Sequence, residues 1–293
     1  MHWVDDILNG LATATPSYRA GGSLAAEPLA LAAMALGAHG RTADAARLCQ
    51  ALTSLASADG SVGIAAGQPT PGWPTGLAVL AWSGAGGAQT AAWREHAERG
   101  AAWLLATGGK SSPRSPGMGH DTTLRGWPWA EGTHSWLEPT IFGLLALKRT
   151  GRGDHARARE AVRLLIDRLL PDGGCNYGNT SVLGQLLRPH LAPSGLALAA
   201  LAGERDESGR IERTIAYLER TLDRQTTSMS LAYGLIGLAA HDRSPPAADA
   251  WLQAASERGG REAAPFQRAL LALAALKAEC PLIFHKPISH QPS

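Results

Sequence analysis

One phrase returns several times along this chain: a turn rich in Gly, Pro and Trp, then a polar residue, then a run of Ala and Leu. The copies read SLAAEPLALAAMAL from Ser23, GWPTGLAVLAW from Gly72, SWLEPTIFGLLAL from Ser135, LAPSGLALAALA from Leu191, and more weakly SMSLAYGLIGLAA from Ser228 and AAPFQRALLALAAL from Ala263. Such repetition is typical of one supersecondary unit stacked several times. Because the polar residue recurs at one place in each unit, we expect function to lie at that place.

Segments with charges at helical spacing alternate with these apolar runs. The stretch DHARAREAVRLLIDRLL from Asp154, for example, carries an apolar stripe at three-to-four spacing on an otherwise charged helix. The Ala- and Leu-rich runs lack a polar face, which is typical of helices buried on nearly all sides. The pattern therefore predicts an outer layer of amphipathic helices around an inner layer of apolar ones.

The expected fold is all-α, with six helical hairpins closed into a single (α/α)6 toroid over residues 1–278. An open solenoid is the alternative, but it would expose apolar terminal faces. Residues 279–293 carry three prolines and are expected to form an irregular tail across the surface. The outer and inner members of the hairpins are predicted at 2–14 with 26–37, 42–57 with 74–83, 90–107 with 137–148, 154–170 with 191–202, 208–223 with 228–239, and 246–258 with 263–277.

Composition narrows the function classes. The formal net charge is +2 without a basic block, which argues against a nucleic-acid partner. Apolar runs of about 10–14 residues are too short for a transmembrane helix. We expect no secretory signal, because no charged segment followed by an apolar segment opens the chain. Three cysteines without paired spacing favour a reducing compartment, and hence a cytoplasmic location.

Two connections are much longer than the usual two to eight residues between helices, namely 108–136 and 171–190. Both precede inner helices, so they should gather at one end of the ring. Loops on a rigid scaffold are where binding chemistry concentrates. This end of the ring is therefore the expected location of a site.

Two turns carry a resemblance to a known superfamily. The sequences ADGSVG (58–63) and PDGGCNYGN (171–179) look like copies of the QW repeat, Q-x-x-x-G-x-W, without its initial Gln and with Val62 and Cys175 in place of Trp. Over nearly its whole length the chain resembles a small, single-domain member of the terpenoid cyclase and protein prenyltransferase α/α-toroid superfamily, which includes squalene–hopene cyclases. The resemblance implies an enzyme of the cyclase, isomerase or lyase type that binds an isoprenoid-like, apolar substrate in a central cavity.

The resemblance also directs attention to acids at the start of inner helices. Class II cyclases carry a D-x-D-D-T acid there, and this chain does not. The nearest counterpart is Glu138 in WLEPT, Glu27 repeats the placement before Pro28, and Asp121 in HDTT is a looser echo. Glu138 and Glu27 could be ordinary capping carboxylates, or desolvated acids with a raised pKa at the mouth of an apolar cavity.

Other residues are candidates for the same site. His134 lies four residues before Glu138 and could act as its partner, or could simply hydrogen-bond within its loop. Trp127, Trp129 and Trp136 could form aromatic walls that stabilise a cation, or could pin the loop to the scaffold. Arg188 and His190 could bind an anionic head group or make a salt bridge. The remaining substrate-binding candidates are Trp73, Tyr177, His120 and Arg125.

Two alternative functions stay open. Cys175 and His190, with His134 and Glu138, are an acceptable zinc set by ligand type, which would fit a zinc-dependent prenyltransferase-like protein. Their spacing does not require a metal, and otherwise no cofactor is expected. The second alternative is a non-catalytic scaffold that binds a lipid or a peptide end. A partner chain could cover the cavity, because two-domain cyclases are about twice as long.

Overall fold

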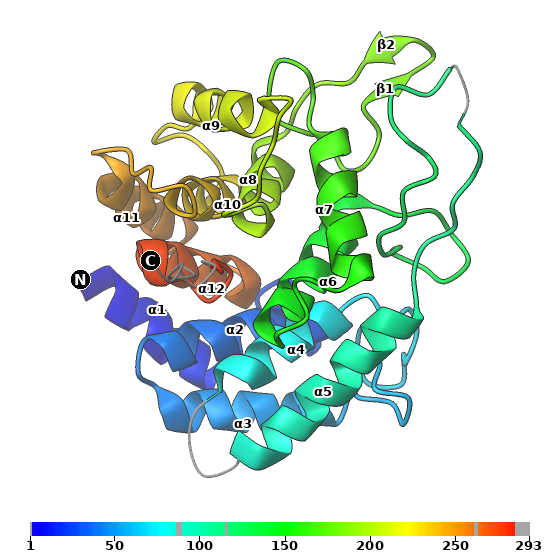
Figure 1. Cartoon of the computed structure of the whole chain (residues 1–293). Helices are drawn as coiled ribbons and strands as arrows, with labels where there is room; N and C mark the ends of the chain where they lie inside the picture. Colours follow the sequence, from blue (N-terminus) through cyan, green and yellow to red (C-terminus); the bar gives the residue numbers. More distant parts are fainter. Residues whose placement is uncertain (1, 86–89, 115–116, 261–262, 285–293) are drawn as a thin grey trace, which may run out of the picture.

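The computed structural model describes residues 2–85, 90–114, 117–260 and 263–284 (Figure 1). Within these ranges the chain forms twelve α-helices, a 3-10 turn η2 (Lys277–Glu279) and a small antiparallel hairpin of β1 (Ser181–Val182) and β2 (Gln185–Leu186). The helices are α1 (His2–Thr13), α2 (Ala26–Ala38), α3 (Thr42–Thr53), α4 (Thr75–Gly84), α5 (Thr90–Ala106), α6 (Leu137–Arg149), α7 (Ala156–Arg168), α8 (Leu191–Ala200), α9 (Arg210–Thr221), α10 (Ser228–Ala239), α11 (Ala248–Gly259) and α12 (Pro265–Ala275).

The even-numbered helices form a closed inner ring. Each packs against the next in the order α2, α4, α6, α8, α10 and α12, and α12 packs back against α2. The odd-numbered helices lie outside, and α1, for example, contacts both α12 and α2. The predicted all-α fold of six outer–inner hairpins is therefore confirmed, and the contact between α12 and α2 rules out the open solenoid.

Hydrophobic patterning explains the two layers. In the outer helix α9 the buried apolar residues Ile211, Ile215 and Leu218 recur at helical spacing, so one stripe faces the core and the charged side chains face water. In the inner helix α2 every residue from 26 to 36 is buried. An inner helix contacts neighbours on all sides, and only an apolar sequence can satisfy such surroundings.

Glycine sets the closest contact in the ring, which lies between α8 and α10. A methyl group on Gly195 would lie 2.1 Å from the carbonyl oxygen of Tyr233, and one on Gly237 would lie 2.3 Å from the carbonyl oxygen of Gly195. The two backbones therefore approach at a distance that excludes any side chain. Both contacts are to backbone atoms, so a larger residue could be accommodated only if a helix moved.

We expect Gly195→Ala to destabilise the protein by about 1–3 kcal/mol, because overpacking a rigid core displaces backbone. Thermal unfolding followed by circular dichroism should show a midpoint lowered by about 2–4 °C for each kcal/mol. Gly84→Ala is the matched control, since its added methyl meets no atom within 4 Å. A midpoint for Gly195→Ala equal to that of the control would show that the helices are less closely packed than described.

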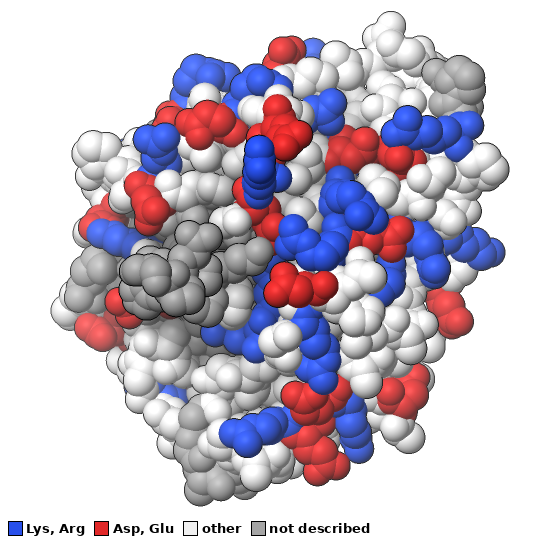
Figure 2. All heavy atoms as spheres, viewed as in Figure 1, with Lys and Arg blue, Asp and Glu red and all other residues white. Residues whose placement is uncertain are grey.

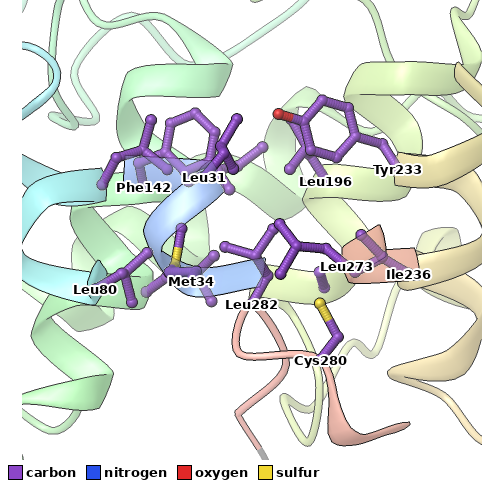
Figure 3. Packing of buried hydrophobic residues seen from close by; sticks show 14 of the residues in the cluster. Leu31, Met34, Leu80, Phe142, Leu196, Tyr233, Ile236, Leu273, Cys280 and Leu282 are labelled. Carbon is purple, nitrogen blue, oxygen red and sulfur yellow. The ribbon is translucent and has the colours of Figure 1, made fainter. Parts of the chain in front are cut away.

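One end of the ring is closed by the chain after α12. Cys280, Leu282 and Ile283 are buried, and Figure 3 shows Cys280 and Leu282 beside Leu273 of α12. Arg149, the last residue of α6, donates a hydrogen bond to the carbonyl oxygen of Pro281 at 2.5 Å. The prediction placed the tail across the surface, but its first residues are apolar and fill the ring instead. Residues 285–293 lie outside the described part of the chain.

The interior of the ring is filled at mid-depth by its own side chains. Leu31, Phe142, Leu196 and Tyr233 come from four different inner helices and converge there (Figure 3). The sequence predicted a central cavity, and at this depth large apolar residues occupy that space. Any ligand site on the ring axis must therefore lie nearer the N-terminal ends of the inner helices.

The surface shows no segregation of charge on the face in Figure 2. Acidic and basic side chains are interspersed there, in keeping with the small net charge. None of the helices in the described ranges has both the length and the apolar character required to cross a bilayer.

Candidate functional site

Two glutamates face one another across the mouth of the ring. Glu27 lies in the first turn of α2 and Glu138 in the first turn of α6, and each precedes a proline that favours helix initiation. Glu27 is 6% exposed, whereas Glu138 is half-buried. Helix α4 separates α2 from α6 in the ring, yet the two carboxyl groups interact electrostatically. The pair therefore spans the opening at the helix N-termini.

Tyr18 covers this pair from the segment between α1 and α2. Its hydroxyl donates a hydrogen bond to Oε2 of Glu27 at 2.6 Å, while half of the residue stays exposed to solvent. The ring packs against Phe266 at the start of α12, with centroids 5.5 Å apart, and the Phe266 amide donates to the Ser17 carbonyl oxygen. Contacts with α12 thus hold the phenol over the carboxyl group.

Tyr233 approaches the pair from inside the ring. It lies in the middle of α10, is 1% exposed, and its hydroxyl oxygen points toward the side of Leu31 and Phe142 (Figure 3). Among the described residues this hydroxyl has no hydrogen-bond partner. A buried hydroxyl without a partner costs free energy. The charges of both glutamates act on this phenol, so Tyr233 presents an available polar group near the pair.

Burial raises the pKa values of all four groups. Desolvation raises the pKa of Glu27 well above its ordinary value, the nearby charge of Glu138 adds to this, and the hydrogen bond from Tyr18 opposes it. Desolvation also raises the pKa of Glu138. The pKa values of Tyr18 and Tyr233 are raised by burial and by the carboxylates, so both phenols stay protonated. The site can therefore hold a carboxyl proton near neutral pH.

This arrangement predicts a stability that falls as the pH rises. In the unfolded chain both glutamates ionise with an ordinary pKa of about 4.3. Because the folded-state pKa values are raised, the stabilisation is complete below the unfolded value and is lost as pH increases through the folded values. We expect Glu27→Gln to raise the unfolding midpoint at about pH 8 and to leave it nearly unchanged at about pH 4.

Calorimetric melting at both pH values measures this effect. The exposed Glu219 of α9 provides the control, because Glu219→Gln removes the same charge without a buried group. If Glu27→Gln and Glu219→Gln shift the midpoint alike at the higher pH, Glu27 does not carry a raised pKa.

An aromatic cavity of about 710 Å³ lies beside the start of α6. Its walls include Trp73, Trp103, Trp127, Trp129 and Pro139, the residue after Glu138. Trp73 and Trp129 meet edge to face with centroids 4.6 Å apart. Its volume is within the range typical of small-molecule sites. Trp129, one of the predicted aromatic walls, and Trp73, another predicted substrate-binding residue, are partly exposed here.

Trp127 anchors the long loop before α6. It is 2% exposed, its indole nitrogen donates to the carbonyl oxygen of Leu104 at 3.0 Å, and the guanidinium of Arg157 lies 4.8 Å from its ring. These contacts fit the loop-packing interpretation of this tryptophan. Arg125, another predicted ligand contact, donates to the carbonyl oxygen of Gly109 and lines the aromatic cavity.

His134, the expected partner of Glu138, lines a pocket whose lining includes neither glutamate of the pair. Its ring contacts Trp136 at 4.7 Å, and His120 lines the same pocket. Asp121 accepts hydrogen bonds from Arg114 at 2.8 Å and from the backbone and hydroxyl of Thr123. These bonds hold the pKa of Asp121 far below its usual range. Tyr18, rather than His134, is thus the neighbour that contacts a carboxyl group of the pair.

The second long loop brings Tyr177 and His190 together. Their rings lie 5.2 Å apart, and the carbonyl oxygen of Tyr177 accepts a hydrogen bond from the amide of Leu137. Arg188 is exposed, and its carbonyl oxygen accepts from Asn176. These residues therefore join the loop to the start of α6, close in sequence to Glu138.

Cys175 is fully buried, and burial raises the pKa of its thiol to about 12. Its sulfur lies 3.8 Å from the hydroxyl of Ser194, and a thiol in such surroundings is neither a strong nucleophile nor a ready zinc ligand. Within the described ranges, no three His, Cys, Asp or Glu side chains gather in a metal-binding arrangement. The zinc-dependent alternative stays a prediction, which elemental analysis of the purified protein would test.

Tyr18 and Tyr233 were not among the residues singled out from the sequence. Tyr18 stands in a Gly-rich turn nine residues before Glu27, a position from which a short segment can fold back over the helix start. That spacing was an available signal. Tyr233 carries no such signal, because it is surrounded by apolar residues of α10 that face every direction.

Comparison with known proteins relates this chain to others through its fold. No protein-family model matches it, and no curated protein matches it in sequence. Among solved structures, it is similar to native alpha-2-macroglobulin from Escherichia coli, in a structure that spans domain MG7 to the C-terminus, with a TM-score of 0.50 and 14% identity. The match covers 93% of this chain and 42% of that chain. At this identity the likeness shows a helical toroid and carries no function.

Proposed function

We propose that this protein is a terpenoid-cyclase-like enzyme that performs acid–base chemistry on an apolar, isoprenoid-like substrate at the N-terminal mouth of its helical ring. The observation that carries the proposal is the pair Glu27 and Glu138, two desolvated carboxyl groups held close enough to influence each other. Such a pair retains a proton at neutral pH and can both give and take one, which is what an acid–base catalyst requires.

In the proposed reaction, Glu138 acts as the acid and Glu27 as the base. The carboxyl proton of Glu138 forms a new C–H bond with one carbon of a substrate double bond, and the other carbon becomes cationic. The Glu27 carboxylate then removes a proton from a carbon next to the cation, and that C–H electron pair forms the new double bond. The numbers of atoms in substrate and product are equal, so the reaction is an isomerisation or a cyclisation. Glu27 then releases its proton to water and Glu138 takes one up from water, which restores both groups for the next turnover.

The surroundings of the pair support this chemistry. The aromatic cavity is lined by Pro139, next to Glu138, and by Trp73 and Trp129. The ring of each tryptophan could stabilise a cation by about 0.5–2 kcal/mol. Tyr18 holds Glu27 through a hydrogen bond from its hydroxyl. Tyr233 supplies a neutral, unpartnered hydroxyl on which the charges of both glutamates act.

Incubation with linear isoprenoids tests the proposal. Alcohols and diphosphates of different lengths are supplied in D2O, and products are analysed by gas chromatography and mass spectrometry. We expect an isomeric product that has gained deuterium at carbon, because the acid exchanges its proton with solvent before each turnover. Recovery of every substrate unchanged and free of deuterium would contradict the proposed activity.

A second candidate is a non-catalytic scaffold that holds a lipid or a peptide end. The observation that favours it is the filled interior of the ring. Leu31, Phe142 and Leu196 occupy the centre, so that a lipid or a peptide end could bind only near the rim. Native mass spectrometry of the purified protein separates the two candidates. A retained ligand that survives long incubation chemically unaltered supports the scaffold, and a ligand converted to an isomer supports the enzyme.

A further inference from the structure

A second pocket, distinct from the acidic pair, lies under the loop between α5 and α6. It has a volume of about 280 Å³, and its polar lining comes from Lys110, Ser112, His120, His134, Arg168 and Asn179. Arg168 is the last residue of α7, so the loop and one outer helix build the pocket together. Neither Arg168 nor Lys110 takes part in the proposed function.

Two buried nitrogen atoms in this pocket have no partner among the described residues. They are Nδ1 of His120 and Nε of Arg168, in side chains of residues that are 9% and 5% exposed. Buried polar atoms are nearly always hydrogen-bonded, and a buried guanidinium donor without an acceptor is costly. Such atoms at the wall of a pocket indicate that a ligand supplies the missing partner.

The charge of the lining identifies the class of that ligand. Lys110 and Arg168 are cationic, and the described lining residues include no carboxylate. Two neighbouring acids are already bonded: Asp167 accepts from Nη1 of Arg168 and from the amide of Asp121, and Asp121 itself pairs with Arg114. One acid therefore offsets part of the charge of Arg168. Lys110 lines the pocket, and Nε of Arg168 has no partner among the described residues. An anion would complete the balance.

We propose that this pocket binds a small oxyanion, a phosphate or carboxylate group, through Lys110, Arg168 and His120. The volume accommodates such a group with a short organic substituent. The proposal is independent of the reaction at the acidic pair, because it uses none of those residues.

The state of His120 provides a specific signature. Burial, followed by the charges of Arg168 and His134, lowers its pKa to about 4, against the opposing charges of Asp167 and Asp121. An anion beside the ring favours the protonated form. Binding should therefore raise the pKa of His120. The NMR signals of the ring of His155, an exposed residue that caps α7, should not move.

Titration calorimetry with inorganic phosphate, methyl phosphate and acetate tests the proposal, with NMR detection of the His120 ring. We expect saturable binding of at least one anion below about 10 mM, and the strongest of the three identifies the group that the pocket prefers. Lys110→Gln, at an exposed position that folding does not need, should weaken binding roughly tenfold, the loss of one charge-assisted hydrogen bond.

Lys277→Gln is the control, because it removes one exposed cation that pairs with Asp249 far from this pocket in sequence. Equal affinity of the Lys110 and Lys277 variants would overturn the proposal, as would the absence of saturable binding for all three anions. Saturable binding together with an upward shift of the His120 pKa, and no movement of the His155 ring signals, would support it.

Discussion

Glu138→Gln is expected to lower turnover of the isoprenoid substrate by at least about a hundredfold, the smallest contribution usual for a positioned general acid. Glutamine keeps the size of the side chain and its place in the first turn of α6, but it has no acidic proton to transfer. Glu138 is half-buried, and desolvation raises its pKa, so the folded protein disfavours a charge at this position. An uncharged glutamine should therefore be tolerated there. Folding should therefore be retained while catalysis is lost.

Product formation and deuterium uptake are measured for the native protein, Glu138→Gln and Glu219→Gln. Glu219 is an exposed residue of the outer helix α9, and its variant should behave as the native protein does. Melting curves show whether each variant is folded. A folded Glu138→Gln protein with undiminished turnover would remove Glu138 from the reaction.

The largest effect on stability is expected at a buried ion cluster between α6, α7 and the turn after α8. Nζ of Lys148 lies 2.8 Å from Oε1 of Glu204 and donates to the carbonyl oxygen of Ala200, and Arg159 contacts Oε2 of Glu204 at 2.9 Å. The side chains of Lys148 and Glu204 are 4% and 1% exposed. Glu204→Gln should cost about 3–5 kcal/mol, because it leaves a buried ammonium without its counter-charge.

Thermal and urea unfolding measure this cost, with Glu207→Gln as the control. Glu207 pairs with Arg205 at the surface, where both side chains are more than four-fifths exposed, and such a pair contributes little. We therefore expect a midpoint lowered by about 10 °C for Glu204→Gln and nearly unchanged for Glu207→Gln. Similar small shifts in both variants would mean that the cluster does not stabilise the fold.

Acid should weaken the same cluster. Burial alone would raise the pKa of Glu204, but the hydrogen bonds and charges of Lys148 and Arg159 lower it below its usual range. The resulting stability is present above the unfolded pKa and is lost as the pH falls through the folded value. The acidic pair has the opposite dependence. Rising pH therefore destabilises the protein through Glu27 and Glu138, and falling pH destabilises it through Glu204.

The layers of the fold could be predicted because the two helix types differ in their sequence. Amphipathic stripes such as Ile211, Ile215 and Leu218 mark an outer helix, and uniform runs of Ala and Leu mark an inner one. Glu27 and Glu138 stood out because each is a polar residue at the start of such a run. Their mutual approach depends on ring closure, which the repeat pattern also indicated.

The rest depended on orientation, which an apolar helix does not encode. Because α10 is buried on every side, its sequence does not tell which residue faces the ring axis, and Tyr233 was therefore missed. His134 was predicted as a partner of Glu138 because it lies four residues before it. It precedes α6, in a loop that also brings it to a pocket shared with His120. The prolines led to the prediction that the C-terminal tail lies across the surface. The apolar residues Leu282 and Ile283 are buried instead.

The proton held between Glu27 and Glu138 is the feature on which the proposed chemistry depends, and NMR titration of the glutamate side-chain carboxyl carbons measures it directly. The Glu27→Gln and Glu138→Gln variants assign the two signals. We expect both signals to titrate well above the ordinary glutamate value of about 4.3, with each variant shifting the titration of the remaining partner. Two independent titrations at the ordinary value would contradict the account.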